Sequence, residues 1–313
     1  MKIFFAKFPE ITLELPKNLL ILSYIVVDMF DKFNILIAGP VYDAEWVTKN
    51  AEYYMNQGFY VTISTWDGWE ADKLRIPHVK YSMNTVAGGK VMGYHPLHKG
   101  ETYSNVYYQC KSVENALNAG MEKTDFVIKL RTDEFYSNLS PVVDRLLANP
   151  NKIVTNNVFL RDQKEFPYSI SDHVIGMSYE NMDKTFRGLC FFMDTYRNLI
   201  STTVFPKGNG SYNNKSTYIN TEPVICKMFL QGVGVMTPLE NDKASVIMQD
   251  HAEYVDVTEM GEYFITANHY NQYWSNIKDI NNNMPKLYDS KKGKKAMKWM
   301  TGENDKAAHL TVV

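Results

Sequence analysis

The sequence predicts an α/β protein in which helices cover both faces of a largely parallel β-sheet. Three observations support this fold class. From residue 32 onward, short β-rich runs alternate with helix-like segments. Glycine, proline and capping residues separate these runs. The chain has 313 residues, of which 45% are hydrophobic and 22% are charged, so it can bury the core of one large domain.

The first predicted unit is a strand, a helix and a second strand. The run "FNILIAG" is typical of a strand that ends at Gly39 and Pro40. The segment "DAEWVTKNAEYYMNQG" predicts a helix that begins after the capping residue Asp43 and stops at Gly58. The second strand is "FYVTISTW". Two strands joined through a helix are expected to run parallel.

The same alternation continues along the chain. "SNVYYQCKSVENALNAG" predicts a helix that ends at Gly120 and is followed by the strand "DFVIKL". "SPVVDRLLANP" predicts a helix with Ser140 as its N-cap, and "KIVTNN" predicts another strand. "INTEPVICKMFLQG" predicts a helix capped by Asn220 or Thr221 and stopped by Gly232.

Composition excludes several classes of partner. A formal charge of -2 gives no general attraction to nucleic acid or to anionic membranes. The three cysteines lack metal-ligand spacing and indicate reduced thiols in a cytoplasmic setting.

The apolar run "NLLILSYIVVDMF" is too short for a spanning helix, which needs about 20 residues. Residues 1–31 are expected to be an N-terminal extension, 32–287 the main domain and 288–313 a basic tail.

The basic tail permits two interpretations. Five lysines and a tryptophan lie close together in it: Lys291, Lys292, Lys294, Lys295, Lys298 and Trp299. The tail is either simply solvated or makes a weak peripheral contact with an anionic membrane surface.

Candidate ligand-binding residues follow the predicted strands, because open α/β sheets bind ligands at the carboxyl ends of their strands. These residues are Gly39 and Pro40, Thr65 and Asp67, and Arg131 to Glu134. No Gly-x-Gly-x-x-Gly motif follows the first strand and no P-loop motif occurs in the sequence. A Rossmann dehydrogenase and a P-loop NTPase are therefore disfavoured.

The segment "DFVIKLRTDE" carries an unusual set of charges. Side chains alternate along a strand, so Lys129, Arg131 and Asp133 share one side of it. Burying these charges is costly unless they pair or hold a ligand. They therefore form either an internal ion-pair ladder or an anion site. In the second case, Asp133 and Glu134 would hold a divalent cation that bridges to phosphate oxygens.

Several sequence blocks resemble, in order, the WavE-like lipopolysaccharide-synthesis proteins. They include "ILIAGPVYDAEWVTKNAEYY", "VTISTWDG", "DFVIKLRTDEFY", "SISDHVIGMS" and "NTEPVICKMFL", and the resemblance spans about residues 34 to 232. It implies a glycosyltransferase with a GT-A-type fold, a nucleotide-binding half at 32–140 and an acceptor half at 141–287. The donor would be a UDP-, GDP- or dTDP-linked sugar and the acceptor a glycan or a lipid-linked molecule, in surface polysaccharide or glycoprotein-glycan synthesis.

The resemblance also implies functional residues. Asp133 matches one carboxylate of the Asp-x-Asp element that holds Mn²⁺ or Mg²⁺ on the donor diphosphate, and Arg131 stands in place of the other. The diphosphate could therefore be neutralised with a metal, in which case Glu134 and His251 are further candidate ligands, or without one. Nucleotide-sugar contacts are expected from these residues: Gly39, Pro40, Thr65, Asp67, Asn105, Gln109, Lys129, Arg131 and His173.

Two carboxylates are candidates for catalysis. Glu222 is either a general base that deprotonates the acceptor hydroxyl or an ordinary acidic residue at a helix N-terminus. Asp172 either binds sugar hydroxyls or caps a turn.

Two alternatives to a glycosyltransferase stay open, namely a non-catalytic carbohydrate-binding protein on the same fold and a sugar nucleotidyltransferase.

Overall fold

The computed structural model describes residues 29–66, 70–77, 79–81, 94–95, 100–101, 105–158, 160, 167–195, 221–235 and 243–265. The strands are β1 (Phe33–Ala38), β2 (Tyr60–Trp66), β3 (Val79–Tyr81), β4 (Tyr94–His95), β5 (Gly100–Glu101), β6 (Phe126–Arg131), β7 (Glu134–Tyr136), β8 (Ile153–Asn156), β9 (Val174–Ser178), β10 (Ala252–Val255) and β11 (Tyr263–Ile265). The α-helices are α2 (Ala44–Asn56), α3 (Asn105–Asn118), α4 (Ser140–Ala148), α5 (Tyr179–Thr195), α6 (Thr221–Gly232) and α7 (Ala244–His251). Short 3₁₀ helices are η1 (Ala71–Lys73) and η4 (Val257–Met260).

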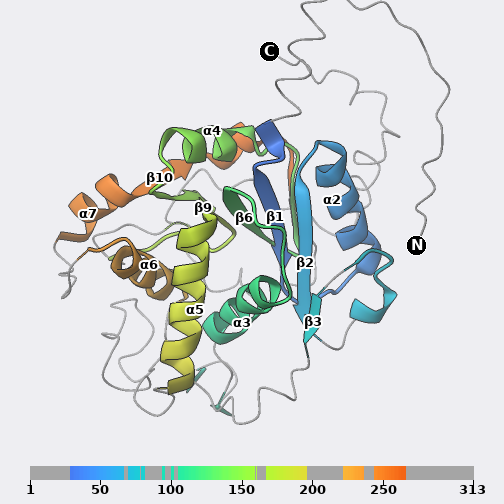
Figure 1. Cartoon of the computed structure of the whole chain (residues 1–313), viewed down its shortest axis with the longest axis horizontal. Helices are drawn as coiled ribbons and strands as arrows, with labels where there is room; N and C mark the ends of the chain where they lie inside the picture. Colours follow the sequence, from blue (N-terminus) through green and yellow to red (C-terminus); the bar gives the residue numbers. More distant parts are fainter. Residues whose placement is uncertain are drawn as a thin grey trace, which may run out of the picture.

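A seven-stranded sheet organises these elements in the order β10-β8-β9-β6-β1-β2-β3 (Figure 1). All neighbouring strands are parallel except β9, which runs antiparallel to both β6 and β8. The prediction of an α/β protein with a mostly parallel sheet is confirmed. The reversed direction of β9 was not predicted, because an apolar run of five residues does not reveal its direction.

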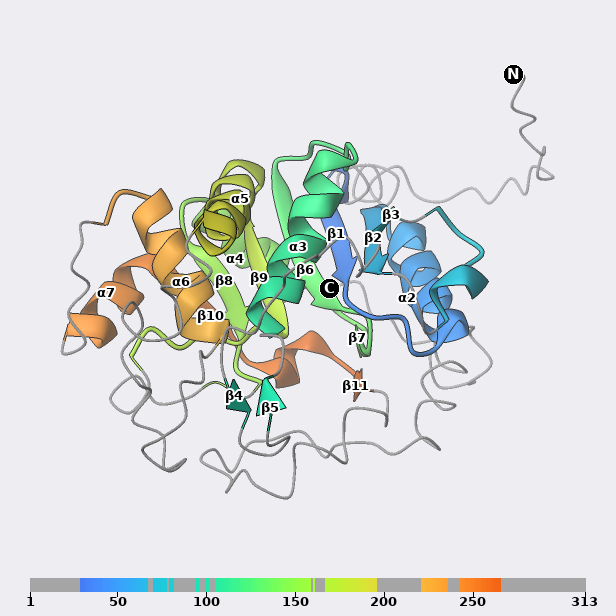
Figure 2. The ribbon, with the colours of Figure 1, turned by 90° about the horizontal axis from the view of Figure 1, so that it is seen from below.

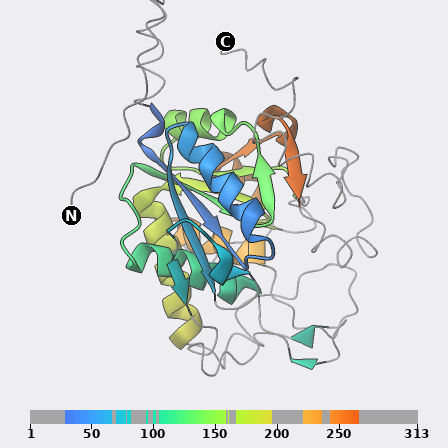
Figure 3. The ribbon, with the colours of Figure 1, turned by 90° about the vertical axis from the view of Figure 1, so that its right-hand side faces the viewer.

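Helices pack on both faces of the sheet (Figures 1 and 3). One core joins inward side chains of α2 and α4 to Ile35, Ile37 and Ile128 of the central strands. The second core joins α3, α5 and α6 to Leu36 and Val127, the side chains that point the other way. Strand alternation therefore divides the apolar residues of β1 and β6 between two cores, as expected for a covered sheet.

Two small pairings lie outside the main sheet (Figure 2). β7 pairs antiparallel with β11, and β4 pairs antiparallel with β5. Only two residues separate the end of β6 from the start of β7, so the chain leaves the main sheet immediately after Arg131. This early departure brings the residues after β6 to the edge where the parallel strands end.

Local signals for the helix ends were mostly correct. The Asp43 carboxylate accepts a hydrogen bond from the Trp46 amide at 2.9 Å and so caps α2. α6 runs from Thr221 to Gly232, which confirms the predicted helix and its end; Thr221 is its first residue, and the alternative cap Asn220 lies outside the described residues. The expected N-cap Ser140 was wrong. Ser140 is the first residue of α4, and its amide donates to the Asn138 side chain at 3.0 Å.

The proposed division into an extension, a main domain and a tail is not tested by the structure. Residues 1–28, the Lys-rich tail and Asp67 lie outside the described residues. No helix in the described ranges combines the length and the apolar character that a membrane-crossing helix requires.

Gly39 fixes how β1 ends. Its backbone has φ +141°, and a Cβ at this position would lie 2.9 Å from the Thr132 hydroxyl oxygen. Thr132 in turn donates a hydrogen bond to the Pro40 carbonyl at 2.7 Å. The missing side chain of Gly39 therefore lets the end of β1 dock against the turn after β6, which is a structural reason for the glycine.

Replacing Gly39 with Ala should reduce the free energy of unfolding by about 3 kcal/mol, because the backbone strain and the contact with Thr132 add together. Gly120→Ala is a matched control, since Gly120 also has positive φ but an added Cβ meets nothing within 4 Å. It should cost about 1 kcal/mol. Denaturant unfolding measures both values, and equal losses would contradict the role of Thr132.

Candidate active site

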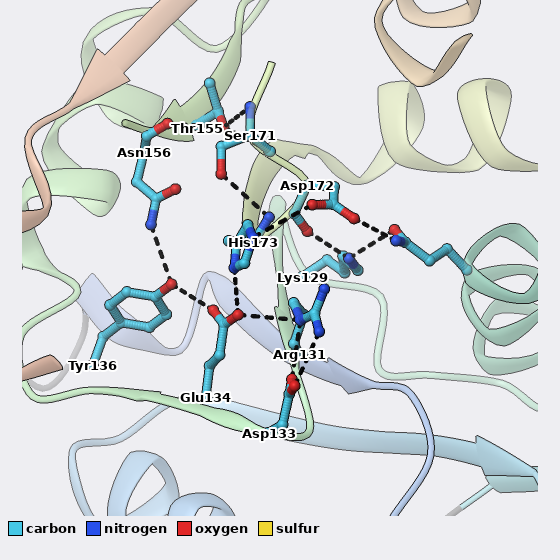
Figure 4. A network of polar contacts seen from close by, with 11 residues as sticks. Lys129, Arg131, Asp133, Glu134, Tyr136, Thr155, Asn156, Ser171, Asp172 and His173 are labelled. Carbon is cyan, nitrogen blue, oxygen red and sulfur yellow. Dashed lines mark hydrogen bonds and ion pairs between the residues drawn. The ribbon is translucent and has the colours of Figure 1, made fainter. Parts of the chain in front are cut away.

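The candidate site lies where the central strand β6 ends. Phe126, Ile128 and Leu130 face one core, and Val127 faces the other on the same side as Lys129. The predicted alternation is thus confirmed within β6, but the expectation that it continues to Asp133 is wrong, because β6 ends at Arg131 and the chain then turns into β7. β9 begins at Val174 beside Leu130, so the residues before β9 lie at the same edge of the sheet. Segments that are far apart in the sequence, the end of β6 and the residues before β9, therefore meet at the site (Figure 4).

Lys129 is a buried amine held between two elements. Its side chain is only 1% exposed. The Nζ atom donates to the Gln109 side-chain oxygen on α3 at 3.1 Å and to the Asp172 carbonyl at 2.7 Å. Burial lowers the pKa of Lys129, although the nearby Asp172 carboxylate partly opposes this effect. The amine therefore ties α3 to the segment before β9.

Arg131 makes a two-pronged ion pair with Asp133. Its Nε and Nη2 atoms donate to the two Asp133 carboxylate oxygens, each at 2.9 Å. Its Nε atom also lies 3.1 Å from Glu134 Oε1. Burial favours a lower pKa for Arg131, but the carboxylates of Asp133 and Glu134 outweigh it and raise the pKa. Arg131 therefore stays a cation at any ordinary pH.

Glu134 is the most connected carboxylate of the cluster. One oxygen contacts His173 Nδ1 and Arg131, and the other accepts a hydrogen bond from the Tyr136 hydroxyl at 2.6 Å. The Asn156 amide at the end of β8 donates to the same hydroxyl at 3.2 Å. Burial and the nearby Glu134 carboxylate raise the pKa of Tyr136 well above its usual value, so the hydroxyl stays a donor.

Asp172 and His173 complete the cluster. The Asp172 carboxylate accepts a hydrogen bond from the Gln109 side chain and lies 3.8 Å from His173 Nε2. Burial by itself would raise the pKa of Asp172, but His173, Lys129 and Arg131 together lower it below its usual range. The carboxylate is therefore ionised in neutral solution.

The structure brings together most of the predicted site residues at this edge. Those joined by contacts in the cluster are Gln109, Lys129, Arg131, Asp133, Glu134, Asp172 and His173. Gly39 and Pro40 lie next to them through Thr132. Thr65 is buried on β2. Asn105 is the first residue of α3, and Asp67 lies outside the described residues.

Two other candidates lie on separate elements. His251 is the last residue of α7 and precedes β10, which is parallel to β8 and therefore to β6. The structure thus places His251 at the amino-terminal edge of the sheet, opposite Asp133, and does not bring the two together as metal ligands. Glu222 lies half-buried in the first turn of α6, and its catalytic role stays a prediction.

A divalent cation fits this arrangement poorly. In the described part of the chain, no group of three or more His, Cys, Asp or Glu side chains is placed to hold a metal. Both Asp133 oxygens already accept hydrogen bonds from Arg131, which also contacts Glu134. A metal at Asp133 would have to displace this guanidinium. The expected Mn²⁺ or Mg²⁺ site at Asp133 and Glu134 is therefore not supported by the donor set.

Sequence reasoning missed several members of the network, among them Tyr136 and Asn156. Asn156 could have been found, because it ends the predicted strand "KIVTNN" and the carboxyl-end rule applies to it. Tyr136 could not, because it contacts Glu134 only after the chain turns out of the main sheet into β7.

Comparisons with known proteins give distant structural similarities at low sequence identity. No family model and no curated protein matches the chain. The galactosyltransferase LgtC, in complex with donor and acceptor sugar analogs, has 14% identity and a TM-score of 0.36, and the match covers 64% of this chain and 70% of that one. An active-site mutant of LgtC has 14% identity and a TM-score of 0.35. That match covers 53% of this chain and 65% of the LgtC chain, which is less than two thirds. A glycosyltransferase involved in the glycosylation of the major capsid of PBCV-1 has 14% identity and a TM-score of 0.32, and the match covers 56% of this chain and 72% of that one.

Replacing Asp172 with Asn should make stability less dependent on pH. A carboxylate with a lowered pKa in the folded state stabilises the protein above its unfolded-state pKa of about 3.9, and this contribution is lost as the pH falls through the folded-state pKa. The variant should lose about 2 kcal/mol at pH near 7, and this loss should shrink progressively as the pH falls below about 3.9. Urea unfolding of the wild type and the variant across this pH range measures the difference in their free energies of unfolding. A difference that does not change with pH would contradict the lowered pKa of Asp172.

Proposed function

We propose that this protein is a glycosyltransferase that moves a sugar from a nucleotide-sugar donor to an acceptor hydroxyl. One observation carries the proposal: a buried, hydrogen-bonded cluster of charged side chains lies at the carboxyl end of β6. Buried charges are expensive and collect preferentially at functional sites. Ligands of open α/β sheets bind at this edge. The ordered resemblance to WavE-like proteins supports the same conclusion.

The two cations of β6 suit the charge that develops during sugar transfer. When the bond between sugar and phosphate breaks, negative charge accumulates on the leaving diphosphate. Arg131 is the more exposed of the two cations, and the buried Lys129 donates a hydrogen bond to the Asp172 backbone carbonyl. A guanidinium binds phosphate oxygens in a planar, forked geometry. Arg131 is therefore the proposed contact for the diphosphate, and Lys129 adds positive charge behind it.

The two candidate carboxylates take different proposed roles. An effective general base has a pKa near the working pH. The lowered pKa of Asp172 makes it a weak base, so we assign it to hydrogen bonds with hydroxyls of the donor sugar or the acceptor. Glu222 is the proposed general base that takes the proton from the acceptor hydroxyl. A hexosyl or pentosyl group fits this chemistry.

The same function implies a class of donor, a class of acceptor and a cellular location. We propose a UDP-, GDP- or dTDP-linked donor and a glycan or lipid-linked acceptor, in the synthesis of a surface polysaccharide or a glycoprotein glycan. Gly39, Pro40, Thr65, Asp67 and Asn105 are proposed nucleotide contacts. The basic tail would bring a cytoplasmic enzyme to the membrane surface, where lipid-linked acceptors reside.

A non-catalytic carbohydrate-binding protein is the second candidate. The observation that favours it is that each carboxylate of the cluster already lies beside a basic group: Asp133 beside Arg131, Glu134 beside His173 and Asp172 beside His173. Such pairing would also stabilise an inert fold. Turnover of a nucleotide sugar separates the two functions, since a binding protein would leave the donor intact.

A nucleotide sugar should stabilise the purified protein. A panel of UDP-, GDP- and dTDP-sugars is tested by thermal shift, each with and without Mn²⁺. At a donor concentration 100-fold above Kd, stability should rise by about 2.7 kcal/mol, which is a shift of several degrees. Release of a nucleoside diphosphate identifies a glycosyltransferase, whereas release of pyrophosphate would indicate a nucleotidyltransferase. If no donor shifts the melting temperature, the proposed function fails for these donors.

Asp133→Asn should lower turnover by about 100-fold or more while the protein stays folded, because the isosteric amide no longer holds the Arg131 charge in place. Asp144→Asn is the control, since Asp144 is exposed on α4. Circular dichroism checks the fold and donor consumption measures turnover. Unchanged turnover in the Asp133 variant would remove this residue from the mechanism.

A further inference from the structure

The carboxylates of Asp133 and Glu134, which follow β6, are less exposed than the Arg131 guanidinium that contacts them. The side chain of Arg131 is 21% exposed, whereas those of Asp133 and Glu134 are 4% and 0% exposed. Arg131 contacts both Asp133 oxygens and one Glu134 oxygen. Figure 4 shows the guanidinium placed between these carboxylates and Lys129. A solute approaching from the solvent therefore meets a cation before it meets the carboxylates.

We infer that Arg131 itself occupies the position that a divalent cation would take, so that Asp133 and Glu134 position a guanidinium and the diphosphate binds to it without metal. This inference rests on the proposed function for the identity of the anion. The arrangement of Arg131 over the two acids stands independently of it.

A guanidinium can perform this role geometrically. It carries five N–H groups in one plane. The Nε–H group and one N–H group of Nη2 point to Asp133. The Nη1 atom and the other N–H group of Nη2 are directed away from those two bonds and can donate to phosphate oxygens. The carboxylates thus fix the orientation of the planar Arg131 guanidinium before a ligand binds, as preorganised electrostatic stabilisation requires.

A divalent cation would have to undo this arrangement. Mg²⁺ requires about six oxygen ligands at about 2.1 Å in nearly octahedral geometry, and Mn²⁺ favours a similar oxygen-rich shell. The two Asp133 oxygens would first have to release Arg131, and the displaced cation would then lie beside the metal. The Lys129 amine, which also faces the cluster, adds to this repulsion when it is protonated.

Direct Mn²⁺ binding tests the inference. Free Mn²⁺ is followed by electron paramagnetic resonance during titration of the full-length wild type, Asp133→Asn, Arg131→Gln and the double variant. We expect no Asp133-dependent Mn²⁺ binding in the wild type. Arg131→Gln should uncover the acids and tighten Mn²⁺ binding by at least about tenfold, and adding Asp133→Asn should remove the gain. One Mn²⁺ bound by the wild type and lost in Asp133→Asn would overturn the inference.

Arg131→Lys provides a second route if the Gln variant does not fold. Lysine keeps the charge but cannot bind two carboxylate oxygens as a fork, so it should partly uncover Asp133 to Mn²⁺. The comparison of wild type with Asp133→Asn needs no change at Arg131 and decides the question alone. A protein that binds no nucleotide sugar but also no Mn²⁺ at Asp133 would contradict the proposed function and leave Arg131 in its assigned place. A donor that binds only with Mn²⁺ would contradict the inference.

Discussion

The burial of Glu134 constrains the whole candidate site. Its carboxylate is inaccessible to solvent and contacts Arg131, His173 and Tyr136, while its backbone carbonyl accepts a hydrogen bond from Asn50 on α2 at 2.9 Å. A buried carboxylate is tolerated only when its oxygens are paired. The end of β6, the start of β7, the segment before β9 and α2 must therefore meet at one point. This requirement holds these segments of the protein together through polar contacts of Glu134.

The same requirement explains why the cluster is both stable and suited to a ligand. Each acid is oriented by a basic or hydroxyl group, so its oxygens have partners without solvent. The guanidinium of Arg131 is more exposed than the carboxylates of Asp133, Glu134 and Asp172. An edge that presents a cation more than its carboxylates is suited to an anion. The placement of that edge, at the ends of the parallel strands, agrees with the general position of ligand sites in open α/β sheets.

Much of the fold was readable from short stretches of sequence. The strands β1, β2, β6 and β8 and the helices α2, α3, α4 and α6 were predicted from apolar periodicity and turn residues. The candidate residues Lys129 and Arg131 were identified by strand alternation, since their spacing fixes which side of β6 they face, whereas Asp133 lies in the turn after β6 and reaches Arg131 from there. The capping role of Ser140 failed because Asn138, two residues earlier, supplies the competing side-chain oxygen.

The sequence by itself determined the class of the fold, the edge where the site lies and the charged side chains that mark it, because these follow from contacts between near neighbours in the chain. Only the tertiary structure decided which charges pair. The contact of His173 with Glu134 depends on the reversed direction of β9, and the position of His251 depends on β10 lying parallel beside β8. Strand order and direction are set by packing across the whole sheet, so no local pattern could reveal that Arg131 lies over Asp133 and Glu134 while His251 lies at the opposite edge.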